Sequence, residues 1–205
     1  MQDVQEDKST PPSERSGGLR ERKRAETHTR IQSEATRLFL AKGFEATTLD
    51  EIAEAAGVSR RSLFHYFGSK EEIVFAAKAD FPDIVAEAIG RRPIDEPLLD
   101  MVENAMADLA ARYQTAEAKA IARLIHDTPA LCAGDQAKYE KMERALSKAL
   151  SDRKGLPESD VACRVTASAA IGIMKLATEA WLSGEDDGPE PFGRSAFAAL
   201  RRVAG

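Results

Sequence analysis

A chain of 205 residues, 43% of them hydrophobic and 31% charged, has the composition of a soluble globular protein of one domain, or of a small domain joined to a larger one. No apolar run approaches the roughly 18 residues that cross a bilayer, and the acidic N-terminus lacks the apolar stretch of a secretory signal. Two cysteines without a CxxC pair argue against a disulfide framework and against a zinc site. These features predict a cytoplasmic protein.

The net charge of −5 is unevenly distributed along the chain. Residues 15–70 carry eleven basic and seven acidic side chains, whereas residues 71–205 carry 17 basic and 23 acidic ones. A basic segment on an acidic body indicates that one end of the protein meets a polyanion such as DNA. The alternative is a solvated basic surface without a partner.

The chain begins with a polar segment, residues 1–19, for which we expect a disordered arm. A helix from residue 20 ends at Gly43, Thr48 caps a second helix and Ser59 caps a third. A fourth helix follows Ser69, carries Phe75 to Phe81, and is kinked or ended by Pro82.

Five further helices are predicted over 97–113, 116–126, 129–152, 158–183 and 190–203. No segment shows the alternation of a β-strand. The sequence therefore predicts an all-α protein of about nine helices. We expect a three-helix head over 20–68 and an all-α body over 69–205.

The second and third predicted helices form a helix-turn-helix unit. Gly57 in the turn between them suits a positive φ angle. The third helix turns Leu63 inward and leaves Arg60 and Arg61 outside, where an arginine can match O6 and N7 of guanine in a major groove. Tyr66, Lys70 and the helix start at Thr47 and Thr48 suit phosphates. The alternative is a solvated face on a common helical turn.

Residues 31–73 resemble the N-terminal DNA-binding domain of the TetR family of bacterial transcriptional regulators. The matching run, over 44–74, is FEATTLDEIAEAAGVSRRSLFHYFGSKEEIV. It contains the family's threonine pair, its IA..AGVS segment, its aromatic third helix and the lysine before the fourth helix. Phe64 stands where the family usually has tyrosine, and Tyr66 where it usually has histidine.

The resemblance implies a ligand-responsive regulator, a repressor, that binds a palindromic DNA operator as a homodimer. It implies DNA contacts by Thr47, Thr48, Ser59, Arg60, Arg61, Ser62, Phe64, His65, Tyr66 and Lys70. The remaining helices would form a domain for ligand binding and dimerisation. Small and apolar stripes along 158–183 and 190–203 predict a four-helix interface between two chains, although the same stripes could pack within one chain.

The second half of the chain is similar to a subgroup whose C-terminal domain is described as binding acyl-CoA-like ligands. The similarity covers residues 124–131, 139–150 and 177–182. We expect a pocket lined by Met101, Leu109, Tyr113, Leu124, Tyr139, Ile171 and Met174, with Arg123 at the anionic end of the ligand. The alternative for each of these apolar residues is the plain core.

Common enzyme signatures (GxSxG, HExxH, P-loop, GxGxxG) are absent from the sequence, and its histidines share no metal-ligand spacing. We therefore expect no enzyme, no cofactor and no metal. A second function class stays open: an all-α ligand-binding or enzymatic protein whose basic head docks on a protein. The run of Arg20, Arg22, Lys23 and Arg24 is either a solvated helix start or an arm that reaches the minor groove.

Overall fold

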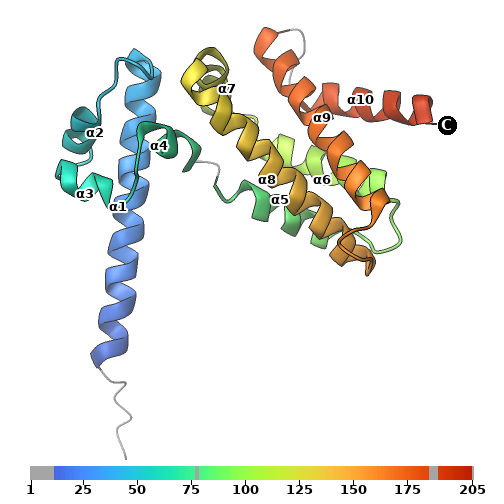
Figure 1. Ribbon diagram of the computed structural model, residues 1–205, viewed down its shortest axis with the longest axis horizontal. Helices are drawn as coiled ribbons and strands as arrows, with labels where there is room; N and C mark the ends of the chain where they lie inside the picture. Colours follow the sequence, from blue (N-terminus) through green and yellow to red (C-terminus); the bar gives the residue numbers. More distant parts are fainter. Residues whose placement is uncertain (1–11, 77–78, 185–188, 205) are drawn as a thin grey trace, which may run out of the picture.

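The computed structural model describes residues 12–76, 79–184 and 189–204, with the side chains of 12–17, 113 and 204 left out of the description. This part of the chain contains ten helices and no strand, which confirms the predicted all-α fold. Figure 1 shows a helical head beside a larger helical body. The helices are α1 (Pro12–Lys42), α2 (Leu49–Ala55), α3 (Arg60–Phe64), α4 (Lys70–Ala76), α5 (Phe81–Gly90), α6 (Leu98–Tyr113), α7 (Ala116–Asp127), α8 (Pro129–Lys154), α9 (Val161–Ser183) and α10 (Pro189–Ala204).

The head is held together by the apolar stripes of its helices. Ile31 and Phe39 on α1 pack with Ile52 on α2, with Leu63 on α3 and with Phe67 beyond it, and all five side chains are buried. Gly57 makes the turn between α2 and α3 with a φ of 63°, which a side chain would resist. This buried packing thus fixes the orientation of α3 relative to α1 and α2.

A capping box sets the start of α2. The Thr48 side chain accepts a hydrogen bond from the Glu51 amide at 3.2 Å, and the Glu51 carboxylate accepts one from the Thr48 amide at 2.8 Å. Lys42, at the end of α1, also donates to Glu51, and these hydrogen bonds lower the pKa of Glu51 to about 2. The carboxylate therefore ties the end of α1 to the start of α2.

The body has its own core, to which α5, α6, α8, α9 and α10 contribute. Ile89, Met101, Leu146, Ala170 and Phe197 are among its buried side chains. Among the described helices, α9 alone has the length and mean hydropathy, 1.3, of a possible membrane span. Its apolar character has another explanation, because one face of α9 supplies this core.

Two predicted boundaries differ from the structure. Phe75 and Phe81 do not share a helix, because α4 ends at Ala76 and Phe81 opens α5. Pro82 lies in the first turn of α5. The N–H groups of a first turn have no partner within the helix, so a proline is tolerated there. At the other end, α1 begins at Pro12, so residues 12–19 are helical where a disordered arm was expected; residues 1–11 lie outside the described part.

The head also extends beyond its expected end at residue 68. Ile73 and Val74 on α4 are buried in the same cluster as Ile31 and Phe67. Ile125 on α7 joins that cluster, as does Leu131 near the start of α8. Head and body therefore share one hydrophobic cluster, and α4 is part of the head.

A close approach between α4 and α8 completes this junction. A Cβ placed on Gly134 would lie 2.2 Å from Cε2 of Phe75, a distance that no methyl group tolerates. Gly134 is thus the position at which α8 admits the ring of Phe75. Any larger residue has to displace that ring.

We expect Gly134→Ala to lower the free energy of unfolding by about 1–3 kcal/mol, because the added methyl group overpacks the junction. Urea unfolding followed by circular dichroism measures this loss. Adding Phe75→Leu to the variant should restore part of the stability. Gly18→Ala is the matched control, since a Cβ there meets no atom within 4 Å. Equal stability of Gly134→Ala and the wild type would contradict the close approach.

Candidate nucleic-acid interface

The helix α3 presents its N-terminal side chains to solvent. Ser59 caps it, and the Ser59 hydroxyl oxygen accepts a hydrogen bond from the Ser62 amide at 3.0 Å. The two hydroxyl groups of Ser59 and Ser62 lie 2.8 Å apart. Leu63 is fully buried and anchors the helix, while Phe64 is 46% exposed. This arrangement suits insertion of α3 into a groove.

The two arginines at the start of α3 differ in their partners. Nη1 of Arg60 lies 2.6 Å from Oδ2 of Asp50 on α2, and its guanidinium lies 5.8 Å from the centroid of the Phe64 ring. Arg61 is exposed and forms no ion pair with any residue in the described part of the chain. Arg60 is therefore held by α2, whereas Arg61 is free to reach a base edge or a phosphate.

Two residues expected at phosphates are engaged inside the head. Thr47 is fully buried, and its hydroxyl donates to the carbonyl oxygen of Gly43 at 2.8 Å. Nζ of Lys70 donates to the carbonyl oxygens of Phe44 and Thr47, each at 3.0 Å, and lies 4.5 Å from the centroid of the Phe44 ring. Both side chains support the loop between α1 and α2. Thr48 is exposed at the start of α2, but its hydroxyl is engaged in the capping box, since it donates to Oε2 of Glu51 at 2.8 Å and accepts from the Glu51 amide.

Beside α3 lies a hollow of about 480 Å³, here called the α1–α3 hollow. His65 is exposed at its edge and Tyr66 is half-buried in its wall. Of the residues that α1 contributes, Arg24 belongs to the run that the sequence offered as a possible minor-groove arm, whereas Thr27 and Arg30 were not predicted as part of the site. The hollow is lined by Arg24, Thr27, Arg30, Val58, Ser62, His65 and Tyr66.

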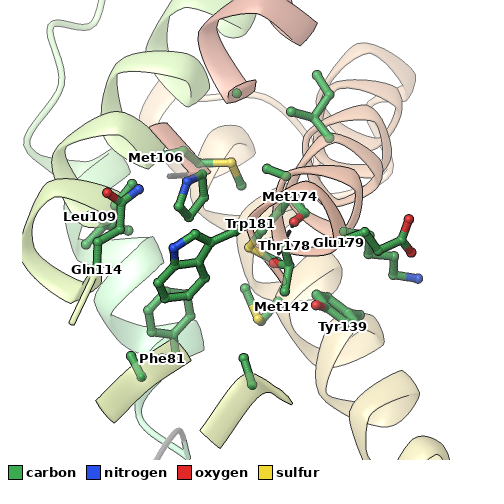
Figure 2. A pocket seen from close by; sticks show the side chains of 18 of the residues that line it. Phe81, Met106, Leu109, Gln114, Tyr139, Met142, Met174, Thr178, Glu179 and Trp181 are labelled. Carbon is green, nitrogen blue, oxygen red and sulfur yellow. Dashed lines mark hydrogen bonds between the residues drawn. The ribbon is translucent and has the colours of Figure 1, made fainter. Parts of the chain in front are cut away.

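The body contains a larger cavity of about 770 Å³ between α5, α6, α7, α8, α9 and α10. Its walls include Leu109, Tyr139 and Met174, which the sequence predicted. Figure 2 shows Trp181 lying between Leu109 on one side and Met174 on the other. The sequence did not predict the other labelled lining residues: Phe81, Met106, Gln114, Met142, Thr178, Glu179 and Trp181.

Four residues expected in the pocket are placed otherwise, and a fifth is not described. Met101 and Ile171 are buried in the body core. Leu124 packs against the hydrophobic cluster of the head, and the guanidinium of Arg123 donates to the carbonyl oxygen of Leu182. The side chain of Tyr113 lies outside the described residues.

The cavity combines apolar walls with a few polar groups. Burial raises the pKa of Tyr139 to about 12, and the Nζ atoms of Lys138 and Lys175 lie 4.1 and 4.9 Å from the centroid of its ring. Nε2 of Gln114 is buried and has no hydrogen-bond partner among the described residues. A ligand acceptor that reached this amide would satisfy it.

The described residues include no group of three or more His, Cys, Asp or Glu side chains placed to hold a metal ion. Both cysteines are free. Cys132 is exposed and contributes to the cavity wall, whereas Cys163 is buried in the body core, where burial raises the pKa of its thiol.

Comparison with known proteins identifies relatives for both parts of the chain. A family model described as bacterial regulatory proteins of the tetR family matches residues 31–77, and a model of the MftR C-terminal domain matches residues 96–204. The chain is similar to the HTH-type transcriptional regulator TcmR of Streptomyces glaucescens, with 29% identity over 201 residues, 94% of this chain and 89% of TcmR.

Two further proteins extend the comparison. The putative mycofactocin biosynthesis transcriptional regulator MftR of Mycobacterium tuberculosis is 30% identical over 169 residues, which cover 80% of this chain and 84% of MftR. The crystal structure of NalD, the secondary repressor of the MexAB-OprM multidrug efflux pump in Pseudomonas aeruginosa, superposes with a TM-score of 0.58 at 18% identity, over 88% of this chain and 96% of NalD. At that identity the superposition shows a shared fold.

We expect Arg61→Ala to weaken binding to a specific DNA site by about 1–3 kcal/mol and to random duplex by less, because base contacts operate only on the correct sequence. Arg60→Ala tests the same role for the arginine that Asp50 holds. Fluorescence anisotropy with both duplexes measures the two losses. Equal losses on the two duplexes for both variants would exclude base reading by these arginines.

Proposed function

The chain belongs to the TetR family of bacterial transcriptional regulators. We therefore propose that it is a repressor and that binding of a small molecule releases it from DNA. It binds a palindromic operator as a homodimer, with one α3 in each of two successive major grooves. The observation that carries this proposal is a short capped helix that exposes Arg60 and Arg61 within a helix-turn-helix unit. The cytoplasm, which holds the bacterial chromosome, is the proposed location.

An exposed apolar face on α9 supports the homodimer. Val161, Val165 and Leu176 lie on that face and are 69%, 62% and 53% exposed. Gly172 lies among them, exposed and without a side chain, so a partner helix can approach closely. On α10, Val203 is also exposed. Two copies of α9 and α10 related by a two-fold axis would bury these residues in a four-helix interface.

We expect Gly172→Arg and Ala169→Glu to give monomers that lose operator binding, because each places a charge in the proposed interface. Sedimentation velocity at micromolar concentration measures the oligomeric state. Ala133→Glu, on an exposed position of α8, is the matched control and should stay dimeric. A wild-type monomer at that concentration would contradict the proposal.

The proposed switch couples the cavity to the spacing of the two heads. Both heads fit successive major grooves only when they lie about 34 Å apart. The helix α8 lines the cavity with Tyr139 and Met142, and it also meets α4 through Gly134. A ligand that changes the position of α8 would therefore move α4 and the head. Its effect is limited by the difference between its affinities for the two arrangements.

For the effector we propose an acyl-CoA-like molecule. A cavity of about 770 Å³ falls within the range usual for small-molecule sites, and its apolar walls suit an acyl chain. The anionic end needs a basic partner other than Arg123, whose guanidinium is engaged by Leu182. Lys138, Lys175 and Arg194 line the cavity and could take that role, with Lys138 and Arg194 giving up their ion pairs to Asp135 and Glu190.

We expect acyl-CoAs of 8 to 18 carbons to release operator DNA with a clear optimum of chain length, because the cavity volume limits the chain that fits. Anisotropy of the DNA complex measures release, and calorimetry measures binding to the free protein. Met174→Trp, which fills part of the cavity, should shift the optimum to shorter chains. No release across the series, together with no heat of binding, would exclude acyl-CoA and leave DNA binding by the head untouched.

A further inference from the structure

The helix α1 extends well beyond the core of the head. From residue 18 on, Ile31 is the first buried residue of α1, and residues 18–26 are exposed. Figure 1 shows α1 continuing past α2 and α3 toward the N-terminus. The extension is therefore a helical arm whose direction the packing of Ile31 and Phe39 fixes.

Over residues 18–30, all lysine and arginine side chains except Arg22 fall on one face of α1. An α-helix turns by about 100° per residue, so positions 20, 23, 24, 27 and 30 lie within a sector of about 120°. Ile31 lies in the same sector, and its side chain faces the core that α2 and α3 cover. The side of α1 that packs against the helix-turn-helix unit thus continues beyond it as a face carrying Arg20, Lys23, Arg24, Thr27 and Arg30, here called the basic stripe.

The acidic residues of the arm lie elsewhere on the helix. Glu21 and Glu26 project about 100° or more from the centre of the basic stripe. Nε of Arg22, also off the stripe, lies 3.5 Å from Oε1 of Glu26. The stripe itself forms no ion pair in the described part of the chain. Its positive charge is therefore not neutralised locally.

The basic stripe leads directly into the α1–α3 hollow. Arg24, Thr27 and Arg30 form one wall of the hollow, and His65 and Tyr66 form part of the other. Arg30 is held in place, because its Nε donates to the carbonyl oxygen of Ala56 at 2.8 Å. Two guanidinium groups, an imidazole and three hydroxyl groups line the hollow, and no carboxylate of the described residues does. This set of donors suits a phosphate oxygen.

We propose that the basic stripe and the α1–α3 hollow bind the sugar-phosphate backbone of the operator, outward from the bases that α3 reads. This inference rests on the proposed function. From Arg30 to Arg20 the stripe is about 15 Å long, at 1.5 Å per residue. That length adds contacts along about four base pairs at the outer end of each half-site. Arg24 contacts a phosphate at the hollow, and Arg20 and Lys23 contact the backbone further out.

The test compares two single substitutions that remove the same charge from the same turn of the arm. The probe is a duplex selected from a random library with the wild-type protein, and a second duplex lacks about four base pairs at each end. Arg24→Ala should lower affinity for the long duplex about three- to tenfold and reduce the slope of log affinity against log salt by about one for each phosphate that the variant no longer neutralises. Arg22→Ala should leave both quantities unchanged.

The trimmed duplex separates binding at the arm from a general effect of charge. With the outer base pairs removed, a Lys23→Ala/Arg20→Ala variant should bind as well as the wild type. Equal losses for Arg22→Ala and Arg24→Ala, or no loss for Arg24→Ala, would overturn the proposal. Arg24-dependent binding of inorganic phosphate, seen by NMR without any change in the DNA salt slope, would do so too. If the wild type selects no duplex at all, the proposed function fails instead.

Discussion

The switch proposed for this regulator depends on the packing of the body against the head. Ile125 and Leu131 belong to α7 and α8, yet they lie in the same hydrophobic cluster as Ile73 and Val74 of α4. Ile125 also lines the cavity of the body. A single side chain thus belongs both to the head cluster and to the cavity wall. Because packed interiors deform little, a ligand that displaces α7 or α8 has to change how the head is held.

The same junction explains the position of Gly134. Most of the packing between α4 and the body would tolerate small shifts, since apolar side chains can repack. The ring of Phe75 lies against the backbone of α8, which cannot yield in the same way. This close approach makes the position of α4 sensitive to the position of α8, and so makes the junction suited to transmit a displacement rather than absorb it.

The head was largely predictable from sequence because the signals that define its helices and turns lie within a few residues of each other. The cap at Thr48, the turn at Gly57 and the buried Leu63 follow from spacing alone, and the structure contains all three. Local spacing could not show which side chains find partners far along the chain. Lys70 donates to carbonyl groups 23 and 26 residues away, and no local pattern shows that those carbonyls need a donor.

The cavity was predictable only in part, for a related reason. Six helices contribute to its wall, and an apolar residue on an amphipathic helix faces either core or cavity according to how those helices cross. Leu109, Tyr139 and Met174 were predicted correctly, whereas Met101 and Ile171 are core residues. Trp181 lies on the apolar stripe along 158–183 that was assigned to the dimer interface, but the structure places it in the cavity wall.

In the proposed switch, the helix α9 would link ligand binding to dimerisation. Met174 and Thr178 line the cavity on one face of α9, while Leu176 is exposed on the face proposed to meet a second chain. A rigid helix cannot turn one face without moving the other. If the effector favours one position of α9, it must favour the dimer geometry that goes with it, and by reciprocity the dimer bound to operator must lower affinity for the effector. One coupling free energy then describes both operator release and effector binding. The packing of α9 between the cavity and the proposed interface determines its size.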